Sequence, residues 1–152
     1  MEQDSLLQFK PPLCDREGKS EIWDGIRKKW VAATPEEFIR QKMIAWLVCQ
    51  AMIPITRISV ERAIPSISAR WDIAVHDSYG KPVLLAECKS QLENIKLEGI
   101  FQAAHYAQAL PSVNWIWVSN GTWLHWLQRN TTQDLWQHSN ERAFLSYSKS
   151  NF

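Results

Sequence analysis

Short apolar runs in the middle and second half of the chain predict β-strands. Two of them alternate apolar and polar residues, and a third, from Val83 to Lys89, begins as a continuous apolar run that is typical of a strand buried on both faces. Asp77-Ser78-Tyr79-Gly80 and Asn120-Gly121 are turn sequences that would join neighbouring strands as hairpins. The predicted strands are residues 55–62, 71–77, 83–89, 114–118 and 122–127.

Two stretches predict helices that would cover this sheet. The first opens with Thr34, Pro35 and Glu37, which fit an N-cap, a first-turn proline and a capping box, and it should run to about Met52. The second covers residues 97–110. The order helix, three strands, helix, then at least two strands predicts an α/β fold with a mixed central β-sheet flanked by α-helices.

Residues 1–33 precede the first predicted helix and form a leader. Residues 11–12 and 15–19 predict loops, and residues 23–31 predict a short helix. We expect the leader to wrap a single domain that spans residues 1–152, because a chain of this length buries about two thirds of its unfolded surface in one core.

Composition narrows the class of protein. Hydrophobic residues make up 45% and charged residues 22% of the chain, and no apolar stretch approaches the roughly 20 residues of a membrane span. Acidic residues stand at the N-terminus where an export signal would carry basic ones, so we expect a cytoplasmic protein. The three cysteines and four histidines lack the paired spacing of a zinc site. A net charge of +1 means that nucleic-acid binding would have to rest on a local site.

Charged residues interrupt the apolar strands at two points. Glu87 and Lys89 end the third strand and point to the same face, because side chains alternate along a strand. Asp72 interrupts the preceding strand, and pairing of the two strands would bring it near Glu87. Two carboxylates suit a hard cation such as Mg²⁺, and Lys89 could orient or deprotonate the attacking water and stabilise charge on a phosphate. A cross-strand ion pair among the same residues is the alternative.

These residues resemble a known nuclease signature. Asp72 followed by Glu87-Cys88-Lys89 is similar to the Asp…Glu-x-Lys motif of the PD-(D/E)xK nuclease superfamily. More narrowly, residues 22–41, 69–75 and 81–90, the spacing from Gln102 to Tyr106 and Ser119-Asn120-Gly121 resemble, in order, small bacterial relatives of the N-terminal nuclease domain of type I restriction enzyme R subunits. The resemblance implies a restriction-endonuclease-like core, Mg²⁺ or Mn²⁺ as cofactor, and hydrolysis of DNA phosphodiester bonds in a restriction-modification setting.

The resemblance also implies roles for individual residues at the metal. Asp72 and Glu87 match the metal-binding carboxylates, and Lys89 matches the catalytic lysine. Glu37 on the first helix matches an acidic residue that can complete the metal's surroundings, although its capping position explains it equally.

A second group of positions matches substrate contacts. Gln102 and Tyr106 would face the site from the second helix and contact a phosphate, or would simply pack that helix on the sheet. Arg40 and Gln41 would either meet a phosphate or brace Glu37.

Two functions remain open from the sequence. The first is a Mg²⁺-dependent DNA endonuclease or nuclease module that acts alone, as a homodimer, or with a partner subunit that supplies specificity, because we expect no motor or target-recognition part in this chain. The second is a nucleic-acid-binding or protein-interaction scaffold that keeps the nuclease fold without meaningful catalysis. The presence of Asp72, Glu87 and Lys89 together favours the first function. The neutral charge and the tryptophan-rich hairpin favour the second, since large apolar residues on a hairpin can make a protein interface, although the same residues could instead meet the core. Its tryptophans are Trp115, Trp117, Trp123 and Trp126.

Overall fold

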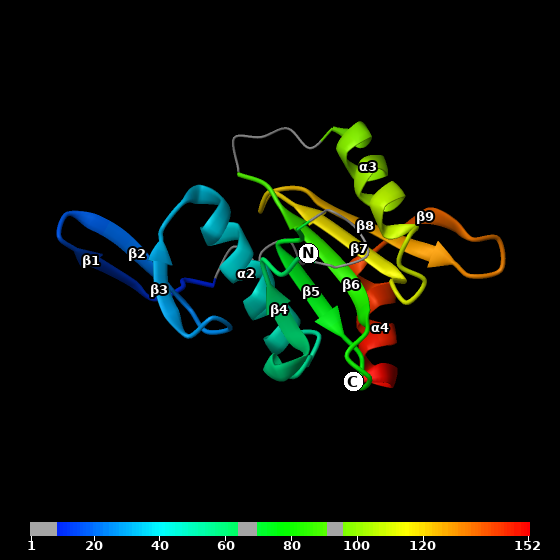
Figure 1. Cartoon of the computed structure of the whole chain (residues 1–152), viewed down its shortest axis with the longest axis horizontal. Helices are drawn as coiled ribbons and strands as arrows, with labels where there is room; N and C mark the ends of the chain where they lie inside the picture. Colours follow the sequence, from blue (N-terminus) through cyan, green and yellow to red (C-terminus); the bar gives the residue numbers. More distant parts are fainter. Residues whose placement is uncertain (1–8, 64–69, 91–95) are drawn as a thin grey trace.

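The computed structural model describes residues 9–63, 70–90 and 96–152, and strands in this part form two sheets (Figure 1). The small sheet has three antiparallel strands in the order β1-β2-β3. The large sheet has six strands in the order β4-β5-β6-β7-β8-β9, in which β6 and β7 are parallel and all other neighbours are antiparallel. The strands are β1 (Leu13–Arg16), β2 (Lys19–Asp24), β3 (Lys29–Ala32), β4 (Ile58–Val60), β5 (Ile73–His76), β6 (Pro82–Cys88), β7 (Trp115–Ser119), β8 (Leu124–Asn130) and β9 (Leu135–Ser139).

Helices cover both faces of the large sheet. Met43 of α2 and Phe144 of α4 belong to the core on one face, and Ile100 and Ala104 of α3 belong to the core on the other. The expected α/β fold, a mixed central β-sheet flanked by α-helices, is therefore confirmed. None of the helices in the described residues combines the length and apolar character needed to span a membrane. The helices are α2 (Pro35–Cys49), α3 (Leu97–Ala107) and α4 (Glu141–Asn151).

Helix α2 begins where its capping signals predict. Thr34 is extended, and its hydroxyl accepts the backbone N–H of Glu37 at 3.1 Å, while Pro35 lies in the first turn. The helix ends at Cys49 rather than at the expected Met52, whose φ of +56° lies in the left-handed region. The predicted helix is confirmed with a shorter C-terminal end.

The leader differs most from its prediction. The helix expected over residues 23–31 is wrong, because this segment contains the end of β2, a turn, and β3. The Asp24 carboxylate accepts the backbone N–H groups of Ile26 and Arg27 at 2.8 and 2.9 Å, which closes the turn. Trp23 and Trp30 then pair across the two strands with their rings edge to face. Figure 1 shows this small sheet beside α2, projecting away from the large sheet; residues 1–8 of the leader lie outside the described residues.

Other strands agree with the sequence except at their ends. The hairpin of β5 and β6 and that of β7 and β8 form as predicted. Residues 55–57 form a short 3-10 helix instead of strand, so that β4 contains only Ile58–Val60. Strand β9 and helix α4 follow the last predicted strand, and they extend the large sheet and its covering layer.

The tryptophans of the β7–β8 hairpin divide between core and surface. Trp115, Trp117 and Trp126 are buried against α2 and α4, and the rings of Trp117 and Trp126 stack with centroids 4.6 Å apart. Trp123 is 59% exposed. Three of the four tryptophans therefore serve the core rather than a partner.

Candidate active site

Strand pairing brings Asp72, Glu87 and Lys89 together at one end of β5 and β6. Ile73 pairs with Ala86, so Asp72 lies beside the continuation of β6 into Glu87 and Cys88. Asp72 Oδ2 accepts the backbone N–H of Cys88 at 2.6 Å. Lys89 Nζ donates to Glu87 Oε1 at 2.9 Å. The three residues therefore lie near one another at this end of the sheet, while their catalytic roles stay predictions.

The site is partly open to solvent. The side chain of Asp72 is 14% exposed, that of Glu87 30% and that of Lys89 38%. Burial raises the pKa of the Glu87 carboxyl above its ordinary value; the hydrogen bond from Lys89 opposes this rise, and the negative charge of Asp72 adds to it. A cation between the two carboxylates would remove this repulsion.

The donor set of the site consists of two carboxylates. In the described ranges, no group of three or more His, Cys, Asp or Glu side chains is arranged to hold a metal ion. Mg²⁺ binds through one or two carboxylates and keeps several of its waters, so a third acidic ligand is not required. One oxygen of Asp72 accepts from Arg40 and the other accepts from the Cys88 N–H. Each oxygen keeps a second lone pair, which is available to a metal ion. In the chemistry of their oxygen donors, Asp72 and Glu87 suit a hard cation, while Mg²⁺ or Mn²⁺ as the cofactor stays a prediction.

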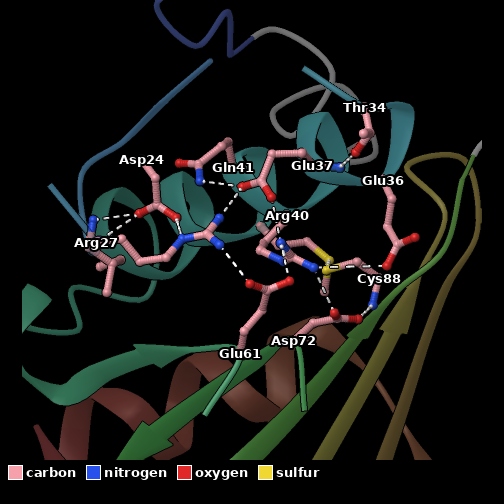
Figure 2. A network of polar contacts seen from close by, with 12 residues as sticks. Asp24, Arg27, Thr34, Glu36, Glu37, Arg40, Gln41, Glu61, Asp72 and Cys88 are labelled. Carbon is pink, nitrogen blue, oxygen red and sulfur yellow. Dashed lines mark hydrogen bonds and ion pairs between the residues drawn. The ribbon is translucent and has the colours of Figure 1, made fainter. Parts of the chain in front are cut away.

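Glu37 points into a network of ion pairs (Figure 2). Its Oε1 accepts from Arg27 Nη2 and from Gln41 Nε2, both at 2.9 Å, and its Oε2 accepts from Arg40 Nη1. Glu37, Arg40 and Gln41 are all buried. Of the two roles expected for Arg40 and Gln41, the observed contacts are those that brace Glu37, whereas the role of Glu37 in a metal shell stays a prediction.

Sequence reasoning missed Arg27 and Glu61, which complete this network. Arg27 Nη1 lies 2.7 Å from Glu61 Oε2, and Arg40 Nη1 lies 3.3 Å from Glu61 Oε1. Asp24-Gly25 is a turn signal that could have placed Arg27 in a hairpin. No local signal connects it with Glu61, because the two residues lie 34 positions apart in the chain.

Glu36 is a third acidic residue near the site that the sequence did not single out. It precedes Glu37 in the first turn of α2, and its Oε1 lies 3.9 Å from Arg40 Nη2. Its negative charge contributes, after burial and after the effects of Lys89 and Asp72, to the raised pKa of Glu87. The first turn of α2 therefore supplies two acids that pair with Arg40, the buried Glu37 and the half-exposed Glu36 at the margin of the site.

The residues expected to contact substrate from α3 are placed only in part. Tyr106 lies on α3 and is exposed, so its ring does not pack the helix on the sheet. That packing comes from Ile100, Ala104 and Ala107. Gln102 belongs to α3 by its backbone, and its side chain lies outside what the structure describes. Contact of both residues with a phosphate stays a prediction.

Comparison with protein families gives a match that covers Asp72, Glu87 and Lys89. Residues 35–140 match the model of the type I restriction enzyme R protein N terminus. This stretch begins with α2, contains Asp72, Glu87 and Lys89, and ends after β9. Comparison with curated proteins and with solved structures gives no match. The family match spans more than half of the 152 residues of the chain. The chain therefore belongs to the family of the type I restriction enzyme R protein N terminus.

Proposed function

We propose that the chain hydrolyses phosphodiester bonds of DNA in a reaction that depends on Mg²⁺ or Mn²⁺. The observation that carries this proposal is the meeting of Asp72, Glu87 and Lys89 at the end of two paired strands, with an ammonium 2.9 Å from one of two neighbouring carboxylates. Membership of the restriction enzyme family supports a nuclease-related domain. Cleavage in the cytoplasm, within a restriction-modification system, is part of the same proposal.

In this mechanism Asp72 and Glu87 would hold the cation. When bound, the cation lowers the pKa of its water and offsets charge on the phosphate. Lys89 orients the water and stabilises negative charge that develops on the phosphate oxygens. Its half-exposed ammonium can be reached by a substrate, while Glu87 fixes its position. Tyr106, exposed on α3, would contact the DNA backbone.

A cleavage assay tests the proposal. Supercoiled, linear, branched and single-stranded DNA would be incubated with the protein in Mg²⁺, Mn²⁺ or EDTA, alongside Asp72→Asn and Lys89→Met. Lys81→Met is the matched control, because Lys81 is exposed in the turn at the opposite end of the same hairpin. We expect metal-dependent cutting by the wild type and by Lys81→Met, and none by the other two variants.

The assay also separates the proposal from its rival. If the folded wild type leaves every DNA form intact in both metals, with and without a candidate partner subunit, the catalytic proposal is wrong and the scaffold is favoured. Cutting that survives Lys89→Met would place the chemistry elsewhere in the chain. The dependence of the cleavage rate on protein concentration would show whether a homodimer is the active form.

A further inference from the structure

Two arginines and two glutamates form a closed ring between the leader and the active site (Figure 2). Arg27 donates to Glu37 at 2.9 Å and to Glu61 at 2.7 Å. Arg40 Nη1 contacts the other oxygen of each carboxylate, because it donates to Glu37 and lies 3.3 Å from Glu61 in an ion pair. Each arginine therefore contacts both glutamates, and each glutamate bridges both arginines.

The ring is anchored at both ends by an aspartate. On the leader side, Asp24 is fully buried and accepts from Arg27 Nε and from two backbone N–H groups of the β2–β3 turn. On the site side, Arg40 Nη2 donates to Asp72 Oδ1 at 2.8 Å. A continuous chain of charged contacts thus runs from the leader turn to a proposed metal ligand.

We propose that Arg40 is a positioning residue for Asp72, and that Arg27 of the leader positions Arg40 through the shared carboxylates of Glu37 and Glu61. The inference rests on the proposed function only in naming Asp72 a metal ligand. It makes the leader, which lies outside the family match, a part of the machinery that orients the site.

Two separate contacts hold the Asp72 carboxylate. Asp72 directly precedes β5, which begins at Ile73, and its backbone carbonyl accepts the N–H of Glu61 at 3.1 Å. Its two carboxylate oxygens are held by separate groups, the Arg40 guanidinium and the Cys88 N–H. These two bonds fix both the position and the rotation of the carboxylate.

The guanidinium of Arg40 suits this task. Its planar fork can bond to Asp72 through one nitrogen and to Glu37 and Glu61 through the other, which a single ammonium cannot reproduce. Burial opposes the charge of Arg40, but the carboxylates of Glu37 and Asp72 outweigh that effect and raise its pKa above the ordinary value. Arg40 therefore stays charged in the folded protein.

The charge balance of the network leaves room for a cation. Two guanidinium groups face five carboxylates, those of Asp24, Glu36, Glu37, Glu61 and Asp72, so that the formal charge is 2 − 5 = −3. One divalent ion at Asp72 would offset two of these three negative charges. The arginines therefore orient the ligand without cancelling the charge that attracts a metal.

The test uses arginine-to-lysine variants, which keep the positive charge of the side chain and remove its planar guanidinium group. Arg40→Lys and Arg27→Lys would be prepared in the full chain, with Arg16→Lys as control, because Arg16 lies in the same small sheet with a side chain 62% exposed. The first readout is the Cys88 backbone amide in metal-free protein, since its N–H donates to Asp72. Its proton resonance should move upfield and its hydrogen exchange should accelerate in both ring variants, and neither should change in the control.

The second readout is Mn²⁺ affinity, measured by electron paramagnetic resonance. Loss of a residue that orients a metal ligand weakens binding by about 10–100-fold, so we expect this range for Arg40→Lys and about tenfold for Arg27→Lys. Unchanged or tighter binding in a folded Arg40→Lys variant overturns the proposal, because it would mean that the arginine is neutral toward the metal or competes with it. If Arg40→Lys does not fold, Glu61→Gln opens the ring at a half-exposed corner and should move both readouts in the same direction.

The two proposals fail in different ways. If the wild-type protein binds no Mn²⁺, the proposed metal site is contradicted. The shift and exchange rate of the Cys88 amide proton then test by themselves whether Arg40 positions Asp72. An amide that is unmoved in both lysine variants overturns the positioning of Asp72. A shift in Arg40→Lys without one in Arg27→Lys overturns the part assigned to the leader.

Discussion

Truncation of Phe144 to alanine should destabilise the protein strongly, although Phe144 lies beyond the family match. The ring is fully buried, with its centroid 4.9 Å from that of Trp126, 5.2 Å from that of Trp115 and 6.2 Å from that of Trp46. Phe→Ala substitutions in a packed core cost about 3–5 kcal/mol. Aromatic pairs add about 0.5–1.5 kcal/mol each beyond buried area, which places the expected loss in the upper half of that range. For a chain of this size, a loss of about 4–5 kcal/mol lowers the midpoint of thermal unfolding by about 8–20 °C.

Urea denaturation followed by tryptophan fluorescence measures this loss directly, because three of the ring's neighbours are tryptophans. Leu135→Ala is the matched control, since Leu135 lies on β9 and is 60% exposed. We expect the control to change the free energy of unfolding by less than about 0.5 kcal/mol. A loss below about 1 kcal/mol in Phe144→Ala would refute the account, because it would mean that α4 does not seal the core.

Three further predictions concern charged and titratable side chains. Lys89→Met should change the free energy of unfolding by less than about 1 kcal/mol in urea, because half-exposed ion pairs contribute little; a larger loss would assign Lys89 a structural role. Glu87→Gln should raise the free energy of unfolding at pH 7, because burial raises the pKa of Glu87 so that the folded state retains its proton to higher pH than the unfolded state. This gain should vanish as pH falls below about 4.3, and a gain that persists there in denaturation series would contradict it. Burial lowers the pKa of His76, so the free energy of unfolding of the wild type should decrease as pH falls below about 6.5, where the unfolded state takes up a proton. His76→Gln should lessen that decrease. A pH profile of stability that is unchanged in this variant would contradict the prediction.

Elements defined by local signals were predictable from the sequence. The start of α2 was predicted from Thr34, Pro35 and Glu37, and the β5–β6 hairpin was predicted from the turn at residues 77–80. The same hairpin places Asp72 beside Glu87, because antiparallel pairing of β5 with β6 sets residues from opposite ends of the hairpin next to each other. These features depend on interactions between residues that are close in the chain.

The leader shows where the sequence was misread. Glu17-Gly18 and Asp24-Gly25 are turn signals, and Glu17 and Gly18 both adopt positive φ in a tight hairpin turn. The loop expected over residues 15–19 contains the first of these turns, whereas Asp24-Gly25 falls inside the segment for which a helix was expected. Helix α4 was missed because Phe144 and Ser148 are its only fully buried residues and most of its other residues are polar or charged.

The use of Glu37 could not be decided from the sequence. A cap, a metal shell and an ion-pair network all require an acid at this position. The structure satisfies the capping hydrogen bond through the Glu37 backbone and leaves its carboxylate for Arg27 and Arg40. That outcome depends on a leader turn and a strand that meet only in the folded chain.

The most direct test of the central claim, that Asp72 and Glu87 share one divalent cation, is a Mn²⁺ titration followed by electron paramagnetic resonance. The account predicts one Mn²⁺ per chain, displaced by Mg²⁺, and loss of this binding in both Asp72→Asn and Glu87→Gln with the fold intact. Binding of the same strength and stoichiometry in both variants would contradict the claim.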